Sequence, residues 1–509
     1  MFDNSPDFLF VNSILILNLA AKKHNPIGHY LSDRTPLWFW SIILQKPMNK
    51  LHYKMKKVLT CIILLSFPFV AIASNPWRMM KKVEKSITVP SFPNRDYIIT
   101  NYHNNEDTLY TKAIDDAIID CSSKGGGRVV VPRGTFLTGA IHLRSNVNLH
   151  LEEGAVLLFT INPNCYPVVL TRIEGIDCYN LSPLIYAYNE NNIAITGKGL
   201  LDGQADFTNW INPDKILHVS FPDGSNGGEK QMLNQALQEQ WPLERRVFQD
   251  AYGMRPQFIN FYKCKNILLE DFEINRSPFW LIHPLMCENI TMRRLTLRSH
   301  GWNNDGCDPE SCKNMLIEDC FFDTGDDCIA IKSGKDDDGR RWMIPSENII
   351  IRGCTMRDGH AGVAIGSEIT GGCHHVWVYD CKMDSPNLVR IIRIKSNANR
   401  GGEVNDIYVK KIEVGVCDLA ILGIELKYWN VDKGEYYPYF HNITLEDISS
   451  KKSRYVLHVD GFEDKALARN IMFKNCRFDG VTEQEPCVEQ GTSNIKYKKV
   501  YVNGKLLSR

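Results

Sequence analysis

The chain has 509 residues, of which 44% are hydrophobic and 23% charged, with 59 basic and 59 acidic side chains. This composition is typical of a globular protein with a sizeable core. A net charge of zero provides no basic field for nucleic acid, so we expect no nucleic-acid partner. Any binding of an anionic polymer must therefore come from local charges.

A secretory signal is predicted over residues 55–73. It begins with the basic sequence Met55-Lys56-Lys57, continues as a mostly apolar run over 58–70, and ends in a small-residue cleavage pattern at Ala73. The run is short for a membrane span, so we expect export to the periplasm or the extracellular space and no span in the mature protein. The alternative is an internal hydrophobic strand. Residues 1–54 are interpreted as a mis-assigned start or a poorly ordered extension.

Residues 109–121 are predicted to form a helix, because apolar residues recur there at helical spacing. Three glycines at 125–127 end the element. Such a helix fits a cap over the first coil of a repetitive fold, whose apolar end and unpaired edges would otherwise be exposed. A loop-rich tail from about Asp479 is expected to close the other end.

A short phrase repeats from about residue 140, in which Asn precedes alternating apolar and polar positions. Examples begin at Asn192, Asn266, Asn289, Asn314, Asn348, His375, Asp406, Asn442 and Asn470. The alternation predicts strands, and spacings of 23 to 36 residues from Asn266 onward fit one coil of a solenoid. No helical segment of crossover length separates these strands, so stacked parallel strands are predicted rather than a βαβ fold.

Residues 203–254 interrupt the repeat. The segment contains two tryptophans and a stretch near 231–240 that is predicted to be helical. Long loops in compact domains are often functional, and the alternative is a surface insertion.

Cysteines alternate with apolar residues at fixed positions of the phrase. Six residues after its starts lie Phe272, Leu295, Cys320, Cys354, Cys381, Ile412, Ile448 and Cys476, and two residues before lie Cys264, Cys287, Cys312, Ser346 and Cys373. Free cysteine packs as a small hydrophobe, so we predict core ladders, with a disulfide framework as the alternative. No Cys/His spacing is typical of a zinc site.

Four polar clusters stand out within the repeat. They are Asn303-Asn304-Asp305-Gly306, Gly325-Asp326-Asp327, Gly359-His360 and Arg393-Ile394-Lys395. Each alone is more often a turn or a solvated face. However, Asp326 and His360 each follow a phrase start by 12 residues, and Asp305 lies 21 residues before Asp326. Because strands of neighbouring coils lie about 4.8 Å apart, these side chains should converge on one face.

The convergence has a chemical consequence. Three carboxylates on one face repel one another, so at least one should hold its proton more tightly than a free Asp. Glycosidic hydrolysis needs one group that protonates the leaving oxygen and another that activates water. Arg393 and Lys395, on a later coil, could hold a substrate carboxylate.

Seven motifs occur in an order known from one protein family. They are KGGGRVVVPRGTFLTGAIHLRSNVNLHL, ITGKGLLDGQ, SPFWLIHP, NNDGCDPESC, TGDDCIAIKSG, AGVAIGSE and IRIKS. Through them the chain resembles, from about Asp96 to about Ser450, the polygalacturonases and exo-polygalacturonosidases of glycoside hydrolase family 28. The resemblance implies an all-β fold, a right-handed parallel β-helix with an N-terminal capping helix. We expect one catalytic domain over 90–509, with an insertion near 203–254.

The resemblance also implies catalytic roles. Through this resemblance Asp326 matches the family's general acid. Asp305 and Asp327 match the pair of aspartates that activates the attacking water. This gives an inverting mechanism, with an acid-to-base gap expected at about 6.5–9.5 Å for at least one pair. His360 resembles the histidine that tunes the acid.

The substrate-binding residues implied by the resemblance are Asn303, Arg393, Lys395 and Tyr428. Arg393 and Lys395 match the binders of the substrate carboxylate, and Tyr428 matches a subsite tyrosine. No cofactor and no metal is implied. Two departures from the family pattern, Asn304 for Thr and Ala361 for Gly, leave the catalytic side chains in place.

The function implied is hydrolysis of α-1,4-galacturonosidic bonds by an exported monomer, acting on pectic polysaccharide or oligogalacturonides. Three alternatives remain. They are a rhamnogalacturonan-type hydrolase of the same fold, a calcium-dependent lyase and a non-catalytic glycan-binding β-helix.

Exo action is expected from the excursion at 203–254. A loop of this size could wall off one end of the cleft, with Trp210 and Trp241 against sugar rings and Arg245 and Arg246 meeting carboxylates. The alternative is that the loop packs elsewhere and touches no substrate.

Overall fold

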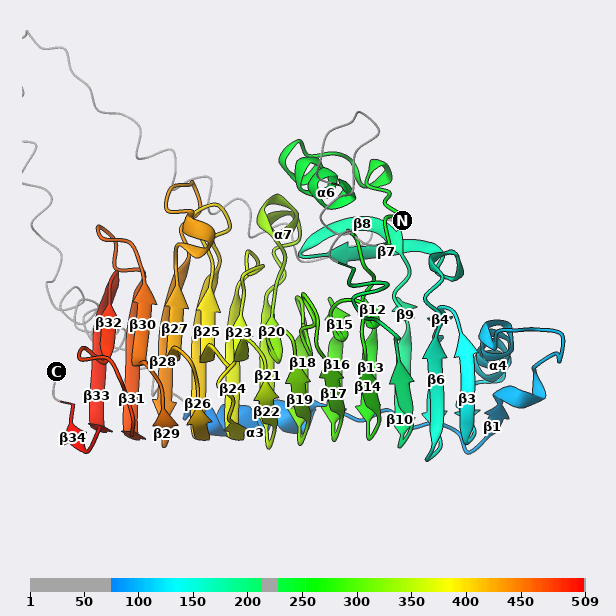
Figure 1. Cartoon of the computed structure of the whole chain (residues 1–509), viewed down its shortest axis with the longest axis horizontal. Helices are drawn as coiled ribbons and strands as arrows, with labels where there is room; N and C mark the ends of the chain where they lie inside the picture. The colour runs from blue at the N-terminus through cyan, green and yellow to red at the C-terminus, as the bar shows by residue number, and fades with distance from the viewer. Residues whose placement is uncertain (1–74, 213–227, 252, 508–509) are drawn as a thin grey trace, which may run out of the picture. The chain divides into compact units, whose positions relative to one another are not determined.

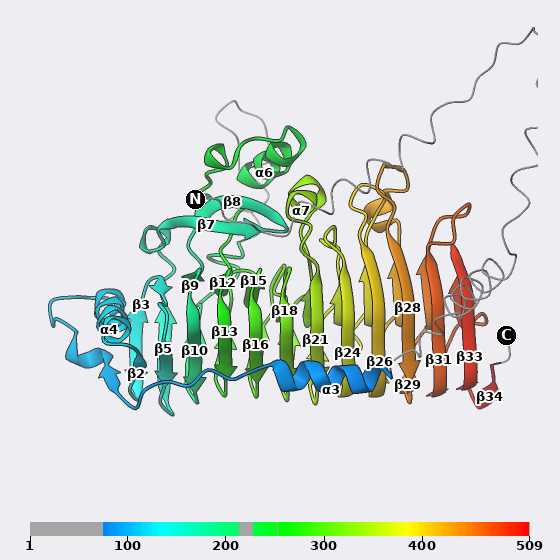
Figure 2. The same ribbon diagram turned by 180° about the vertical axis from the view of Figure 1, so that it is seen from behind.

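A computed structural model of the chain describes residues 75–212, 228–251 and 253–507. The predicted signal at 55–73 and the segment 1–54 lie outside the described residues. From Asn75 onward the described chain folds as the predicted right-handed parallel β-helix (Figures 1 and 2). No helix in this part of the chain is long and apolar enough to cross a membrane.

The coils stack their strands in three rows. The first row consists of β1 (Asp96–Ile98), β2 (Gly127–Val131), β5 (Val147–Leu151), β10 (Asn191–Gly197), β13 (Lys265–Glu270), β16 (Glu288–Arg293), β18 (Lys313–Glu318), β21 (Ser346–Arg352), β24 (Cys373–Met383), β26 (Glu403–Val416), β28 (Tyr439–Glu446), β31 (Ala468–Phe478) and β33 (Thr492–Val502). The second row consists of β3 (Gly134–Thr138), β6 (Ala155–Phe159), β11 (Leu200–Asp202), β14 (Glu273–Asn275), β17 (Thr296–Ser299), β19 (Phe321–Thr324), β22 (Thr355–Asp358) and β29 (Ser449–Lys452). The long strands β24, β26 and β31 continue into the second row.

The third row carries the functional face. It consists of β4 (Ile141–His142), β9 (Ile185–Tyr188), β12 (Ile259–Tyr262), β15 (Ile282–Leu285), β20 (Ile329–Ile331), β23 (Ala361–Ile365), β25 (Arg390–Lys395), β27 (Ala420–Glu425), β30 (Tyr455–Asp460) and β32 (Cys487–Glu489). Between β15 and β20 the ladder is reduced to isolated bridges at Cys307 and Glu310. The row is therefore irregular where the motif NNDGCDPESC crosses it.

The residue that starts each phrase adopts an unusual backbone conformation, which the sequence pattern did not predict. Asn192, Asn266, Asn289 and the later phrase starts all adopt positive φ, a conformation that Asn tolerates better than most residues. Side-chain amides of these residues, and of Asn494 on the last coil, donate to the side chain of the preceding coil at 3.2 Å or less in seven pairs: 192–146, 266–192, 289–266, 348–314, 442–406, 470–442 and 494–470. This ladder sets the turn between the third and first rows in the same register on successive coils.

The predicted core ladders of cysteine are confirmed. No disulfide joins the 15 cysteines of the described residues, and all except Cys165 are buried. Cys264, Cys287 and Cys312 stack at one phrase position, and Cys320, Cys354 and Cys381 at the other. They fill the same core as Ile, Leu and Phe.

Helices close and flank the β-helix. The predicted cap is present as α4 (Thr111–Ser123), whose buried face of Ala113, Ile114, Ala117 and Ile118 joins the core at the first coil. An additional helix, α3 (Pro76–Ser86), lies across strands of the first row (Figure 2). Its Met80 and Val83 pack with Leu316, Ile350 and Trp377. Short β34 (Lys505–Leu506) pairs antiparallel with β33 at the other end.

The excursion folds onto a hairpin rather than standing alone. The hairpin is formed by β7 (Val168–Ile173) and β8 (Ile176–Leu181), paired antiparallel. The excursion contributes α6 (Gly228–Gln238) and η4 (Leu243–Arg245), and its apolar side packs on Ile173, Ile176 and Cys178. Helix α7 (Asp336–Trp342) lies beside both, at the edge of the third row (Figure 1). The short helices η2 (Ile99–Asn101), η3 (Pro163–Cys165) and η5 (Tyr428–Asn430) complete the elements.

Candidate active site

All eight predicted site residues line one pocket of about 310 Å³ on the third row. The set is Asn303, Asp305, Asp326, Asp327, His360, Arg393, Lys395 and Tyr428. They come from the turns that lead from the second row into the third on successive coils and from β25 and η5. The solenoid register therefore brings together residues that lie up to 125 positions apart in the sequence.

The three aspartates form the centre of the pocket. One carboxylate oxygen from each of Asp305, Asp326 and Asp327 lies within 4.8 Å of the others. Asp305 and Asp327 are buried, whereas the side chain of Asp326 is 22% exposed. The most accessible of the three carboxyls is therefore the predicted acid.

Two of the aspartates sit in opposite electrostatic environments. Burial raises the pKa of Asp305 well above its ordinary range, and the charges of Asp308 and Asp326 add to the effect. Burial alone would also raise the pKa of Asp327, but the ammonium of Lys395, 2.8 Å away, holds it below its ordinary value. Asp305 thus holds its proton more tightly than a free Asp, whereas Asp327 holds its proton less tightly, as expected where like charges compete.

His360 is tied to the predicted acid. Its Nδ1 lies 2.9 Å from Oδ1 of Asp326, and its backbone N–H donates to the Asp326 carbonyl. The hydrogen bond to Asp326 raises the pKa of His360 above its ordinary value. The imidazole therefore holds its proton to a higher pH while it is paired with Asp326.

The cations form the wall on the C-terminal side. Arg393 donates to Glu425 at 2.8 Å, and its guanidinium lies 5.6 Å from the Tyr428 ring centroid. The ammonium of Lys395 lies 5.4 Å from the same ring. Tyr428 therefore faces both cations, an arrangement that holds them over the pocket.

Asn303 and Asn304 have different tasks. The Asn303 side chain accepts a hydrogen bond from Arg255 and lines the pocket. Asn304 is buried, donates to the carbonyls of Ser277 and Phe279, and accepts from Ser299. This Asn, one of the departures from the family pattern, therefore fixes the loop that carries Asp305.

Sequence reasoning missed part of the pocket. Its lining also includes Glu174, Trp280, Lys332, Ser367, Glu368 and Trp429. Lys332 is 3.2 Å from Glu368 and 4.6 Å from the centroid of the Trp280 ring. Lys332 lies in the motif TGDDCIAIKSG and Glu368 in the motif AGVAIGSE, so the motifs could have identified them as candidates. The sequence did not show that their side chains line the pocket, because that depends on the geometry of the coils.

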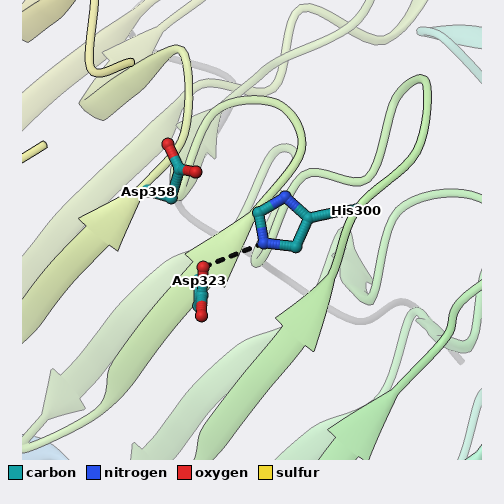
Figure 3. A group of neighbouring side chains, drawn as sticks. All are labelled: His300, Asp323 and Asp358. Atoms are coloured by element: carbon teal, nitrogen blue, oxygen red, sulfur yellow. Dashed lines mark hydrogen bonds and ion pairs between the residues drawn. The ribbon is translucent and has the colours of Figure 1, made fainter. Parts of the chain in front are cut away.

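A second polar group supports the loops from the side. His300, Asp323 and Asp358 meet beside the site (Figure 3), with 2.9 Å between His300 Nε2 and Asp323 Oδ1. Asp358 accepts hydrogen bonds from Gly359, Ser385 and Asn387. These three residues lie two or three positions before Asn303, Asp326 and His360 respectively. The carboxylates of Asp323 and Asp358 already accept hydrogen bonds within the protein, so we assign this group to stabilising the loops.

The prediction that tryptophans and arginines of the excursion contact substrate is wrong, because none of the four named residues lines the pocket. Trp210 is only 2% exposed and packs against Tyr166, because it belongs to the core. Arg246 is buried in an ion pair with Asp338. Arg245 stacks on Trp241, and neither lines the pocket. The excursion instead contacts the site through the hairpin, since Lys230 of α6 pairs with Glu174 at its turn.

The predicted acid-to-base gap is also not found. The nearest oxygens of the three aspartates lie within 4.8 Å, shorter than the expected separation of about 6.5–9.5 Å. The reason is the solenoid itself, which places side chains of adjacent coils about 4.8 Å apart. The stereochemical course must therefore be read from the product.

Three clustered carboxylates, a histidine paired with one of them and two cations over the same pocket of a parallel β-helix define a glycoside hydrolase. The chain belongs to the glycosyl hydrolases family 28, whose family model matches residues 234–499.

Relatives of known name agree with this membership. A probable polygalacturonase of Vitis vinifera is 32% identical over 315 residues, 60% of this chain and 57% of that protein. An exo-poly-alpha-D-galacturonosidase of Dickeya chrysanthemi is 26% identical over 400 residues, 74% of this chain and 65% of that protein. The crystal structure of a hyperthermoactive exopolygalacturonase from Thermotoga maritima matches with a TM-score of 0.76 and 34% identity, covering 85% of this chain and 97% of that one.

Proposed function

We propose that the protein hydrolyses α-1,4-galacturonosidic bonds of pectin and polygalacturonate. The carrying observation is the pocket in which Asp305, Asp326 and Asp327 meet beside Arg393 and Lys395. The aspartates supply acid and base, and the two cations match the carboxylate that distinguishes galacturonate from neutral sugars. The names of the relatives support this substrate. The predicted signal supports export to the periplasm or the extracellular space.

In the proposed reaction Asp326 donates its proton to the leaving oxygen. Asp327, ionised beside Lys395, takes a proton from the attacking water, and Asp305 orients that water. The leaving oxygen gains one proton from Asp326, and Asp327 takes one from the water, so the proton balance of the bond cleavage closes. Asp327 then releases its proton to solvent, and solvent returns a proton to Asp326 through His360, whose Nδ1 lies 2.9 Å from Asp326 Oδ1.

A direct displacement by water should invert the anomeric centre. We expect the first product seen by ¹H NMR, recorded within the first minutes on reduced oligogalacturonide, to be the β-anomer released from an α-linkage. A first product of α configuration would contradict the single displacement and indicate a covalent intermediate on one of the aspartates.

We further propose exo action, with a different structural reason from the one the sequence suggested. The β7–β8 hairpin brings Glu174 into the pocket, and α6 and α7 pack against the hairpin. The hairpin and α6 lie over the coils that precede β20, and α7 lies above β20 itself (Figure 1). We infer that this assembly closes the groove on this side, so that a chain end occupies the pocket.

Product analysis decides the mode of attack. We expect monomeric galacturonate as the main early product from polygalacturonate on thin-layer chromatography, with slow loss of viscosity. A ladder of mid-sized oligomers with rapid viscosity loss would show endo cleavage and overturn this part of the proposal.

The same assay separates the alternatives. A lyase would produce unsaturated ends that absorb in the ultraviolet and would lose activity with a calcium chelator. A rhamnogalacturonan hydrolase would leave polygalacturonate intact, and a non-catalytic binder would release no reducing ends.

A further inference from the structure

We propose that His374 and His375 form a binding site for a divalent transition-metal ion of the Cu²⁺ class, outside the catalytic pocket. The two residues lie at the start of β24, where the chain turns from the third row into the first. His375 takes the position that Asn holds at most other steps of the side-chain ladder. Neither histidine lines the catalytic pocket, so the site is structural and stands independently of the proposed function.

The backbone brings the two imidazoles together. Successive side chains of a regular strand point to opposite faces, but the φ of 59° at His375 breaks this alternation. Nδ1 of His374 lies 3.0 Å from Nδ1 of His375, and the ring planes meet at 89°. Two nitrogens at this separation can both reach one ion at about 2.0–2.1 Å. They then subtend an angle of about 90° at the ion, as in the tetragonal coordination of Cu²⁺ or Ni²⁺.

A carboxylate stands behind each ring. Nε2 of His374 lies 3.6 Å from Oε2 of Glu347, and Nε2 of His375 lies 3.6 Å from Oδ2 of Asp406. A carboxylate beside Nε2 favours the proton on that nitrogen, which leaves Nδ1 as an electron-pair donor. The same carboxylate–histidine arrangement orients the imidazole ligands of metal sites. Two such Nδ1 atoms 3.0 Å apart favour a cation that both can bind.

The preceding coil supplies an oxygen. Asn348 is the phrase start one coil before His375, and its Nδ2 donates to Asn314 Oδ1 at 3.0 Å on the coil before that. Its Oδ1 therefore faces the coil of His375. This oxygen is buried and has no hydrogen-bond partner among the described residues. A buried acceptor without a partner is destabilising, and a bound cation would offset that cost. The register thus offers Asn348 Oδ1 as a further ligand.

The histidines are both accessible and supported. Their side chains are 28% and 27% exposed, so an ion can reach them from solvent. The ring of Trp377 lies parallel to that of His375 within 11°, at 6.1 Å between centroids. Trp377 is itself buried against Met80 and Val83 of α3. The imidazole of His375 is therefore held in place before an ion binds, which lowers the entropic cost of binding.

Titration of the tag-free full chain with Cu²⁺ tests the site directly. The EPR spectrum of the first equivalent should show coupling to two nitrogens. His375→Asn should lower the Cu²⁺ affinity by more than about 100-fold, beyond the effect of changes outside the ligand set, because a single nitrogen cannot chelate. This variant restores the Asn of the ladder, so we expect it to fold. His374→Asn should weaken binding in the same way.

His441→Asn is the matched control. Like His374, His441 lies one residue before a phrase start and beside a carboxylate, with 2.7 Å between its Nε2 and Oε1 of Glu403. The next residue is Asn442 rather than a second histidine. The control should therefore keep the native Cu²⁺ affinity.

Thermal melting provides a second readout. Saturating Cu²⁺ should raise the Tm of the native protein and of His441→Asn but not that of His375→Asn. Ca²⁺, which prefers oxygen ligands, should leave all three unchanged. Failure of the native protein to bind Cu²⁺, or native affinity in His375→Asn and His374→Asn, would overturn the proposal. Loss of binding in His300→Asn instead would place the ion at the group of Figure 3 and overturn it as well.

Discussion

Replacing Asp326 with Asn is expected to lower kcat/KM on digalacturonate by about 10²–10⁴-fold, the usual contribution of a general acid. The amide keeps the size of the carboxyl but cannot donate a proton of comparable acidity to the leaving oxygen. Because Asp326 is the most accessible of the three aspartates, its loss should disturb the fold little. Activity and thermal melting of the purified variant check both statements. Asp380→Asn, an exposed aspartate on β24, serves as the control.

The leaving group distinguishes the acid from the base. The fluoride ion leaves a galacturonosyl fluoride without needing a proton from the enzyme. The Asp326→Asn variant should therefore lose far less activity on this substrate than on digalacturonate. Asp327→Asn and Asp305→Asn should lose activity on both substrates, since each still needs an activated water. This comparison matters because burial raises the pKa of Asp305 well above its ordinary value. If Asp305→Asn, rather than Asp326→Asn, were rescued by the fluoride, the two roles would be exchanged.

Replacing Arg172 with Met is expected to lower the free energy of unfolding by about 3–5 kcal/mol, the cost of breaking a buried ion pair. Arg172 is fully buried on β7 and donates to Asp177 at 2.7 Å and to Glu310 at 2.8 Å. Its loss leaves two buried carboxylates with fewer positive neighbours. Denaturant unfolding measures the change. Arg454→Met, which breaks an exposed pair with Glu483, should cost less than about 1 kcal/mol.

The deficit of Arg172→Met should depend on pH. Burial favours the neutral form of Asp177 and Glu310, but in the native protein Arg172 holds the pKa of both below the ordinary value. Ionised carboxylates therefore contribute stability above the unfolded pKa of about 4. In the variant burial prevails and both pKa values rise. The deficit should thus be greatest at neutral pH and shrink as the pH falls toward 4, and a pH-independent deficit would show that lost packing dominates.

The sequence determined the β-helix and the members of the site. A strand period of two, a coil repeat of 23 to 36 residues and Asn at the start of each phrase leave few folds open. Once the coils are in register, residues 12 positions after successive phrase starts must lie side by side, which is why Asp326 and His360 meet. The cysteine ladders follow from the same register, because equivalent positions face the same core.

Only the tertiary structure decided what surrounds those residues. Trp210 and Arg246 look like substrate contacts in the sequence, yet one enters the core and the other pairs with Asp338. Glu174 enters the pocket from a hairpin more than 100 residues away in sequence from Asp305, with no repeat to predict its position. Periodicity fixes neighbours within the solenoid, because each coil repeats the last. Insertions follow no period, so their packing depends on complementary surfaces that form only when the chain is folded.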